Sequence, residues 1–147
     1  MFRFNLEPVL KLRARTLEKA QVALAESQRA EAAVRTRLKG LGAEKERARL
    51  EFAARTAAGL KAEEYLLRRF HLDGLGKRIQ ETKKELAGCR KVVHKRRQEL
   101  VKADREKKMT ERLKELSYER YQEEMKLREL KALDEFSVLR FARTGGR

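Results

Sequence analysis

Few residues of this 147-residue chain could do chemistry by their type and spacing. The candidates are His71, His94 and the single cysteine, Cys89. Neither histidine has a carboxylate or a thiol three or four residues away, where a second ligand or proton carrier would share its helical face. Phosphate-binding glycine loops and Cys/His metal spacings are missing as well. The sequence therefore predicts no metal and no cofactor, and we expect the protein not to be an enzyme.

The chain is strongly basic, with a formal net charge of +15. The stretch from Lys77 to Arg97 holds nine basic and two acidic residues. Such a stretch indicates an acidic protein partner, nucleic acid or an anionic membrane surface, or is simply a solvated helical face. Aromatic residues are missing between Phe70 and Tyr118, so nothing there could stack on bases, and we expect no specific nucleic-acid binding. The lone cysteine fits a reducing compartment, and we expect a cytoplasmic protein.

The composition is typical of long helices, since charged residues make up 41% and proline occurs once. Apolar residues recur at alternating spacings of three and four along two stretches, which is the pattern of a helix that packs on a partner helix. We predict an all-α fold, a long antiparallel two-helix coiled coil, as a single domain over residues 1–147. Its helices cover about 5–57 and 63–141, its turn about 58–62, and its flexible tail 142–147.

The position of the turn follows from which residues would face each other. Gly59 and the triplet Gly74-Leu75-Gly76 both could form it. A turn near residue 74 sets apolar positions against charged ones, whereas a turn near residue 60 pairs large with small apolar residues, as close packing requires. The turn near residue 60 pairs Leu17 with Ala103, Ala20 with Leu100, Val34 with Leu86, Leu41 with Ile79, and Ala48 with Leu72. The glycine triplet then lies inside the second helix, where we expect local weakness or a bend.

The second helix is predicted to overhang the first. With the turn at residue 60, the start of the first helix faces residue 114, so residues 115–140 have no partner in the chain and span roughly 39 Å. The apolar spacing shifts phase just before this part, and we expect Met109, Leu113 and Leu116 to replace the earlier seam positions. Apolar residues continue along it at helical spacing, namely Leu116, Tyr121, Leu127, Leu130, Leu133 and Phe136. An apolar stripe of this length must be buried in a partner or in a second copy of the chain.

Both ends of the sequence resemble those of a known family. The start, FRFNLEPVLKLR followed by a helix rich in Glu, Ala and Leu, and the tail LKALDEFSVLRF, with Leu133, Asp134, Glu135 and Phe136, resemble the flagellar FliJ family of type III export proteins. The resemblance covers essentially the whole chain. It implies a coiled coil similar to that of the rotary ATP synthase gamma subunit.

The resemblance also implies a function and partners. The family's rod inserts into the hexameric ring of the flagellar export ATPase and promotes ring assembly and ATP hydrolysis. It links the ring to the cytosolic region of the export gate, a membrane protein, and acts as a general chaperone that handles export chaperones. The implied location is the cytoplasmic face of the inner membrane, with peripheral membrane association as a further expectation.

The resemblance assigns two sets of contact residues. The ATPase-ring contact would comprise Phe4, Leu6, Arg13, Leu127, Leu130, Asp134, Glu135 and Phe136, with Phe2, Phe4 and Leu6 packed on the end of the second helix. The export-gate contact would comprise Leu41, Phe70 and Leu75, although Leu41 and Leu75 are also seam positions. The alternatives are a generic coiled-coil homodimer, a cargo chaperone, or a basic hairpin that binds nucleic acid or a membrane surface.

Overall fold

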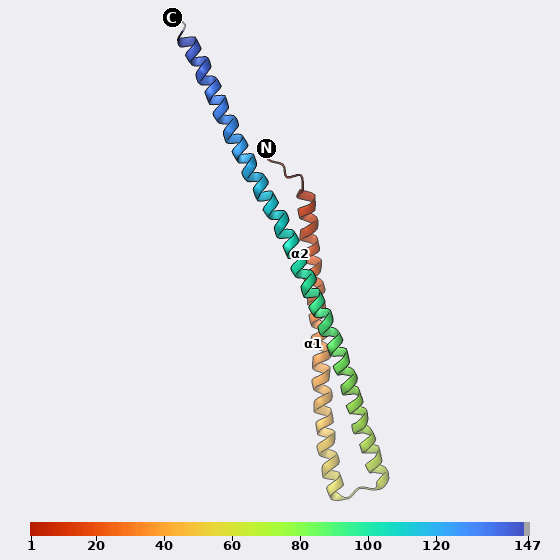
Figure 1. Cartoon of the computed structure of the whole chain (residues 1–147). Coiled ribbons are helices and arrows are strands. Elements are labelled where there is room, and N and C mark those ends of the chain that lie inside the picture. The colour runs from red at the N-terminus through yellow and green to blue at the C-terminus, as the bar shows by residue number, and fades with distance from the viewer. Residues whose placement is uncertain (146–147) are drawn as a thin grey trace. The chain divides into compact units, whose positions relative to one another are not determined.

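A computed structural model describes residues 1–145, and the described part consists of two long helices without strands. Helix α1 covers Glu7–Ala58 and helix α2 covers Ala62–Thr144. The two pack against each other in opposite directions, so the predicted all-α antiparallel fold is confirmed (Figure 1). The chain divides into two compact units. We call residues 18–101 the hairpin unit, and residues 1–17 together with those from Lys102 on the terminal unit.

The turn of the hairpin unit lies at residues 59–61, as predicted. Gly59 has a φ of 94°, in the left-handed region that favours glycine, and its amide donates a hydrogen bond to the carbonyl of Thr56 at 3.2 Å. The amide of Tyr65 donates to the carbonyl of Lys61 at 3.0 Å and so starts the ladder of α2. The glycine therefore ends α1 because it can take a backbone conformation that other residues rarely adopt.

The core of the hairpin unit is a single seam between α1 and α2. Its buried residues are Val34, Leu41, Leu75, Thr82, Leu86 and Val93. The residues of the predicted facing pairs are all buried or half-buried. The hydroxyl of Thr82 donates to the carbonyl of Arg78 at 2.8 Å, so this buried polar group is satisfied within its own helix. A narrow seam of this kind explains how so charged a chain can fold without a globular core.

Ion pairs across the seam support the same register. Arg68 lies 3.5 Å from Glu51, Arg90 lies 3.7 Å from Glu31, and Arg37 pairs with Glu85. The members of each pair are nearly equidistant from residue 60, as a turn at that position requires. These pairs are exposed or partly exposed, so each contributes little to the free energy of folding, and the buried seam carries the stability.

In the terminal unit, the seam of α2 continues without the predicted change of phase. Ala103 and Thr110 are buried and Lys114 is half-buried, all on the alternating three-four spacing of the hairpin unit. Met109 and Leu113, which we expected on the seam, are 68% and 48% exposed. That prediction is wrong because the seam here is polar. The hydroxyl of Thr110 bonds to its own helix, and the side chain of Lys114 forms an ion pair.

Helix α2 ends at Thr144, three residues beyond the predicted end of the helix. The hydroxyl of Thr144 donates to the carbonyl of Arg140 at 2.9 Å, and the amide of Gly145 donates to the carbonyl of Phe141 at 2.8 Å. These bonds hold the last turn, so residues 142–144 are helical and not part of a tail. The rest of the predicted tail, residues 146 and 147, lies outside the described residues.

The glycines of the triplet offer a test of stability. Helix α2 runs through Gly74 and Gly76 without a break, and a Cβ atom built on Gly74 meets nothing within 4 Å. We expect Gly74→Ala to raise the free energy of unfolding by about 1 kcal/mol, because alanine loses less backbone entropy in a helix. Gly59→Ala, the control, should lower it because of the positive φ. Urea unfolding followed by circular dichroism measures both, and equal effects of the two substitutions would contradict the argument.

Candidate partner-binding site

The first six residues of the terminal unit form a non-helical arm that lies along α2. The ring of Phe2 packs edge-on against that of Tyr118, with centroids 5.2 Å apart, and lies 5.5 Å from that of Tyr121. Each such aromatic pair contributes about 0.5–1.5 kcal/mol beyond its buried area. Phe4 and Leu6 line a hollow with Ser117 and Tyr121. The arm therefore covers part of α2 that we predicted to be bare.

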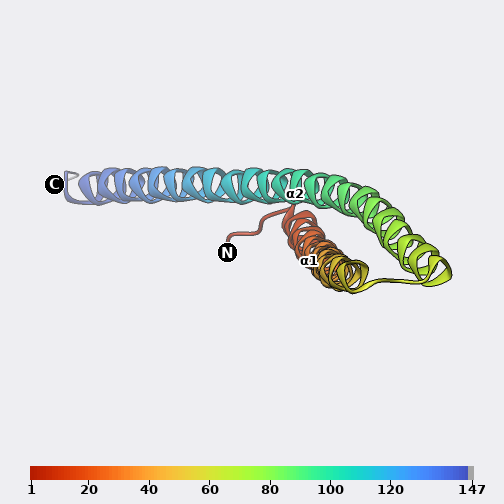
Figure 2. The same ribbon diagram turned by 90° about the horizontal axis from the view of Figure 1, so that it is seen from below.

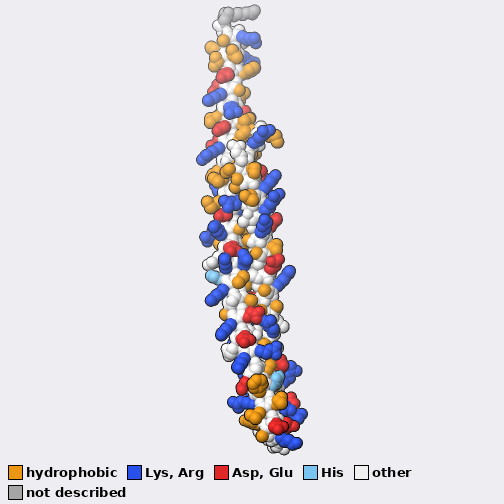
Figure 3. All heavy atoms as spheres, turned by 90° about the vertical axis from the view of Figure 1, so that its right-hand side faces the viewer, with side chains coloured by type: hydrophobic (Ala, Val, Ile, Leu, Met, Phe, Trp, Pro, Cys, Tyr) orange, Lys and Arg blue, Asp and Glu red, His pale blue; other side chains and the backbone are white. Residues whose placement is uncertain are grey.

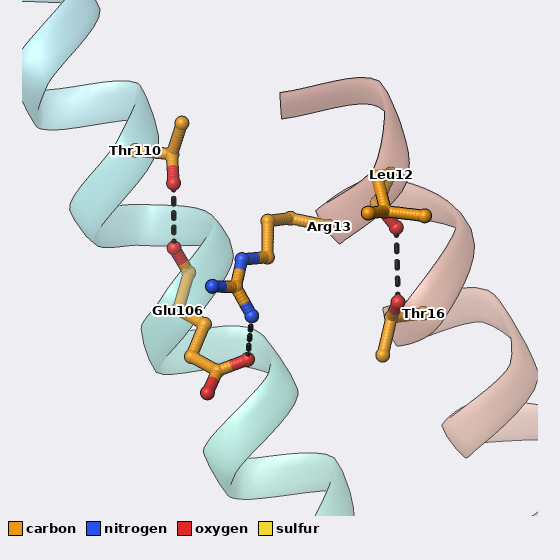
Figure 4. A network of polar contacts seen from close by, with 5 residues as sticks. All are labelled: Leu12, Arg13, Thr16, Glu106 and Thr110. Atoms are coloured by element: carbon orange, nitrogen blue, oxygen red, sulfur yellow. Dashed lines mark hydrogen bonds and ion pairs between the residues drawn. The ribbon is translucent and has the colours of Figure 1, made fainter. Parts of the chain in front are cut away.

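Two ion pairs hold the start of α1 to α2 in this unit. The Nζ of Lys114 lies 2.7 Å from Oε2 of Glu7, and Arg13 pairs with Glu106. Figure 4 shows the guanidinium of Arg13 reaching from α1 to the Glu106 carboxylate, while Thr110 donates to the backbone carbonyl of the same glutamate. Arg13, which the resemblance places in the ring contact, is thus engaged inside the unit, with 39% of its side chain exposed.

On the exposed surface of α2, charged side chains of this unit pair within the helix. Arg112 donates to Glu115 at 2.8 Å, and this hydrogen bond, together with the charges of Glu119 and Glu115, raises the pKa of Arg112. Lys108 contacts Asp104 at 2.8 Å, which raises the pKa of Lys108. Both raised pKa values favour the charged forms of Arg112 and Lys108. These pairs stabilise the helix locally.

Beyond Met125, which is half-buried, every described residue of α2 is exposed. Figures 1 and 2 show no other element of the terminal unit beside this part of the helix. Residues 126–144 span roughly 28 Å at the rise of an α-helix. We call residues 126–144 the bare segment. It is shorter than predicted because the arm lies against α2 between Ser117 and Glu124.

The bare segment carries large apolar side chains in the open (Figure 3). They are Leu127, Leu130, Leu133, Phe136, Val138, Leu139 and Phe141, each between 57% and 78% exposed. Asp134 and Glu135 are exposed among them. Sequence reasoning missed Val138, Leu139 and Phe141, although the predicted second helix, about 63–141, contains all three. Monomeric soluble proteins rarely leave large apolar patches in water. An exposed apolar cluster of this size therefore indicates a binding surface.

A second exposed apolar group lies near the turn of the hairpin unit. Leu66, Leu67 and Phe70 are 66%, 74% and 82% exposed. Phe70 also lines an open groove of about 910 Å³ between α1 and α2. Leu41 and Leu75, the other residues of the predicted gate contact, are 6% and 2% exposed and face the seam. The structure therefore brings only Phe70 of the three to the surface.

Neither unit presents a metal-binding group among its described residues. No group of three His, Cys, Asp or Glu side chains within residues 1–145 could hold a metal ion. Cys89 is half-buried and forms no disulfide. In the described part of the chain, neither helix contains a segment apolar enough to cross a membrane. What the surfaces offer is binding by apolar side chains and by charge.

Comparison with known proteins connects these surfaces to a family. The family model described as "Flagellar FliJ protein" matches residues 2–146. The chain belongs to the FliJ family. With the family it is a component of the type III protein export apparatus. The FliJ family is a non-catalytic part of that apparatus. Among curated proteins, none matches the sequence of this chain.

A solved structure supports the fold of this FliJ-family chain. It is CT670 from Chlamydia trachomatis, a protein described as a YscO homologue. The TM-score is 0.53, the sequence identity is 18%, and the alignment covers 100% of both chains. At this identity the similarity concerns the fold alone. It shows that a two-helix arrangement of this length occurs in a solved protein.

Proposed function

We propose that this FliJ-family protein is the central stalk of the export ATPase, which inserts the bare segment into the hexameric ring. The observation that carries the proposal is the run of exposed apolar side chains along residues 126–144, with no other element beside it. A single helix, about 10–12 Å in diameter, is narrow enough to enter the bore of a ring. The stalk acts by binding alone and is not an enzyme.

Burial of this segment would supply the energy of assembly. Transfer of each leucine or phenylalanine side chain from water into an apolar environment is favourable by about 1.5–3 kcal/mol of free energy. Ring subunits that contact one common helix would be held together by it, which favours the assembled ring over free subunits. ATP hydrolysis would rise with the share of ATPase subunits that are assembled in the ring. Asp134 and Glu135 would fix the orientation of the helix through polar contacts.

The finer partners follow from the family and the second apolar group. Phe70, with its exposed neighbours Leu66 and Leu67, would meet the cytosolic region of the export gate, while Leu41 and Leu75 support this surface from the seam. Export chaperones would dock on the exposed helical faces, in keeping with a general chaperone role. These contacts would hold the protein at the cytoplasmic face of the inner membrane.

The test is ATP hydrolysis by the cognate export ATPase with the full-length chain, with residues 1–125, and with neither. The shorter chain keeps every contact of the arm with Tyr118 and Tyr121. We expect only the full-length chain to form the complex and to raise the turnover. If both chains raise it equally, or neither binds, the stalk proposal fails. If the full-length chain is a dimer and the shorter chain a monomer by light scattering, the bare segment pairs with a second copy instead.

A further inference from the structure

The open groove between α1 and α2 in the hairpin unit combines apolar and basic side chains. We call it the hairpin groove. Its lining holds four basic and two acidic side chains, together with Phe52, Phe70 and Leu72. The ring of Phe52 packs on that of Tyr65, with centroids 5.2 Å apart, which fixes part of the apolar lining. Phe70 is 82% exposed, so its ring is open to a partner.

Two of the four basic side chains are already paired within their own helices. Arg49 lies 2.6 Å from a glutamate of α1, and Arg69 lies 3.9 Å from Asp73 of α2. Lys45 of α1 and Lys77 of α2 are exposed and take part in neither pair. The groove therefore offers one ammonium group from each helix to an acidic partner.

Gly76 keeps the hairpin groove open where the two helices meet. It lines the groove, and a Cβ atom built on it would lie 3.5 Å from Nζ of Lys45. The ammonium group of Lys45 therefore reaches from α1 to the backbone of α2, and a large side chain at residue 76 would fill the space beside it. Gly74, two residues earlier, is not among the residues that line the groove, and a Cβ atom there meets nothing within 4 Å. The two glycines of the triplet thus differ in their surroundings.

We propose that the hairpin groove takes an acidic segment of the export gate, whose carboxylate meets Lys45 and Lys77 while an apolar side chain packs on Phe70. This inference rests on the proposed gate contact and names the chemistry of the segment that makes it. A carboxylate accepts charge-assisted hydrogen bonds from ammonium groups. Asp73 and Glu81 line the same groove and would repel the continuous row of phosphates of a nucleic acid. A peptide can place a single carboxylate next to an apolar side chain, and so fits both parts of the lining.

The expected effects are moderate because the groove is open to water. An ion pair at an exposed site strengthens binding by up to about fivefold. Removal of both ammonium groups should therefore weaken binding about tenfold. A leucine at residue 76 should weaken it by a similar factor, because its side chain would occupy the space beside Lys45 that the carboxylate needs.

The experiment measures the affinity of the full-length chain for two fluorescent probes by anisotropy at low salt. One probe is the cytosolic region of the cognate export gate, and the other is a synthetic peptide that places glutamate beside leucine. The test variants are Lys45→Gln with Lys77→Gln, and Gly76→Leu. Both should bind each probe about tenfold more weakly than the wild type. Versions of the peptide with glutamine for glutamate, or with serine for leucine, should bind the wild type more weakly by a similar factor.

Matched controls separate the groove from general effects of charge and of the glycines. Lys39→Gln with Lys91→Gln removes the same charge from exposed positions of α1 and α2 outside the lining of the groove. Gly74→Leu makes the same substitution as Gly76→Leu at the glycine outside the lining. Both controls should bind the probes with wild-type affinity. Thermal unfolding by circular dichroism checks that all four variants fold.

Several results would overturn the proposal. Equal loss in a test variant and its control would show an effect of net charge or of the helix and not of the groove. Failure of the wild type to bind the glutamate–leucine peptide, or equal binding of the serine version, would refute the two-part recognition. If the gate region binds the wild type and the Lys45/Lys77 variant equally, the gate contact stands and the acidic segment is refuted. If the gate region does not bind the wild type, the gate contact fails and this inference fails with it. Stimulation of the export ATPase should be the same for all variants, so neither result affects the stalk proposal.

Discussion

Removal of two large side chains from the bare segment, Leu130→Ala with Phe136→Ala, should weaken the complex with the export ATPase at least a hundredfold. The two side chains are 57% and 65% exposed in the free chain, so the partner must bury them. Truncation of a well-buried anchor in an interface costs about 2 kcal/mol or more, and each 1.4 kcal/mol is tenfold in affinity. Titration calorimetry and the rate of ATP hydrolysis measure the two consequences.

The stability of the free chain should hardly change in this double variant. Exposed substitutions away from special features alter the free energy of unfolding by less than about 0.5 kcal/mol, and alanine is the best helix former. A loss of binding therefore reports on the contact and not on unfolding.

A matched control separates the bare segment from apolar surface in general. Leu66→Ala with Leu67→Ala removes side chains that are 66% and 74% exposed in the hairpin unit. These two substitutions should leave ring binding intact. Wild-type affinity in the Leu130/Phe136 variant would place the ring contact elsewhere on the molecule. An equal loss of affinity for the export ATPase in both double variants would mean that the bare segment has no special role in the contact.

The helices, the turn and the register could be predicted because they depend on spacing. Residues buried between two helices must recur every three or four positions, and Gly59 is the residue that ends α1 with a positive φ. Large and small side chains then had to alternate across the seam, which selected the turn at residue 60. The burial of both Val34 and Leu86 agrees with that choice.

The terminal unit was harder to predict because its seam does not depend on apolar residues. A search for hydrophobic periodicity finds Met109 and Leu113 and passes over Thr110 and Lys114, which are the residues that face the seam. A lysine can lie there because Glu7 of α1 neutralises it at 2.7 Å, a contact between residues 107 positions apart. The arm is too short to show any period. Its course along α2 depends on where the ring of Phe2 can pack.

Substitution of Leu75 and of Phe70 should affect stability to very different extents, although the two residues lie close together on α2. Leu75 is 2% exposed, so Leu75→Ala leaves a cavity in the seam and should lower the free energy of unfolding by about 3 kcal/mol. Phe70 is 82% exposed, so Phe70→Ala should lower it by less than about 0.5 kcal/mol. Urea unfolding followed by circular dichroism gives both values.

Binding to the cytosolic region of the export gate should show the reverse order. Phe70→Ala should weaken that complex about tenfold or more, because an aromatic side chain so exposed has its apolar area available for a partner. Under conditions in which its hairpin unit is folded, Leu75→Ala should bind the gate with nearly wild-type affinity, since the side chain of Leu75 faces α1 and not the partner. Equal destabilisation by the two substitutions would mean that Phe70 is packed in solution. If Phe70→Ala binds the gate with wild-type affinity, the Phe70 side chain is not part of the contact. Because Phe70→Ala leaves the seam intact, the affinity of this variant for the gate is the cleaner measure of whether this end of the hairpin unit docks there.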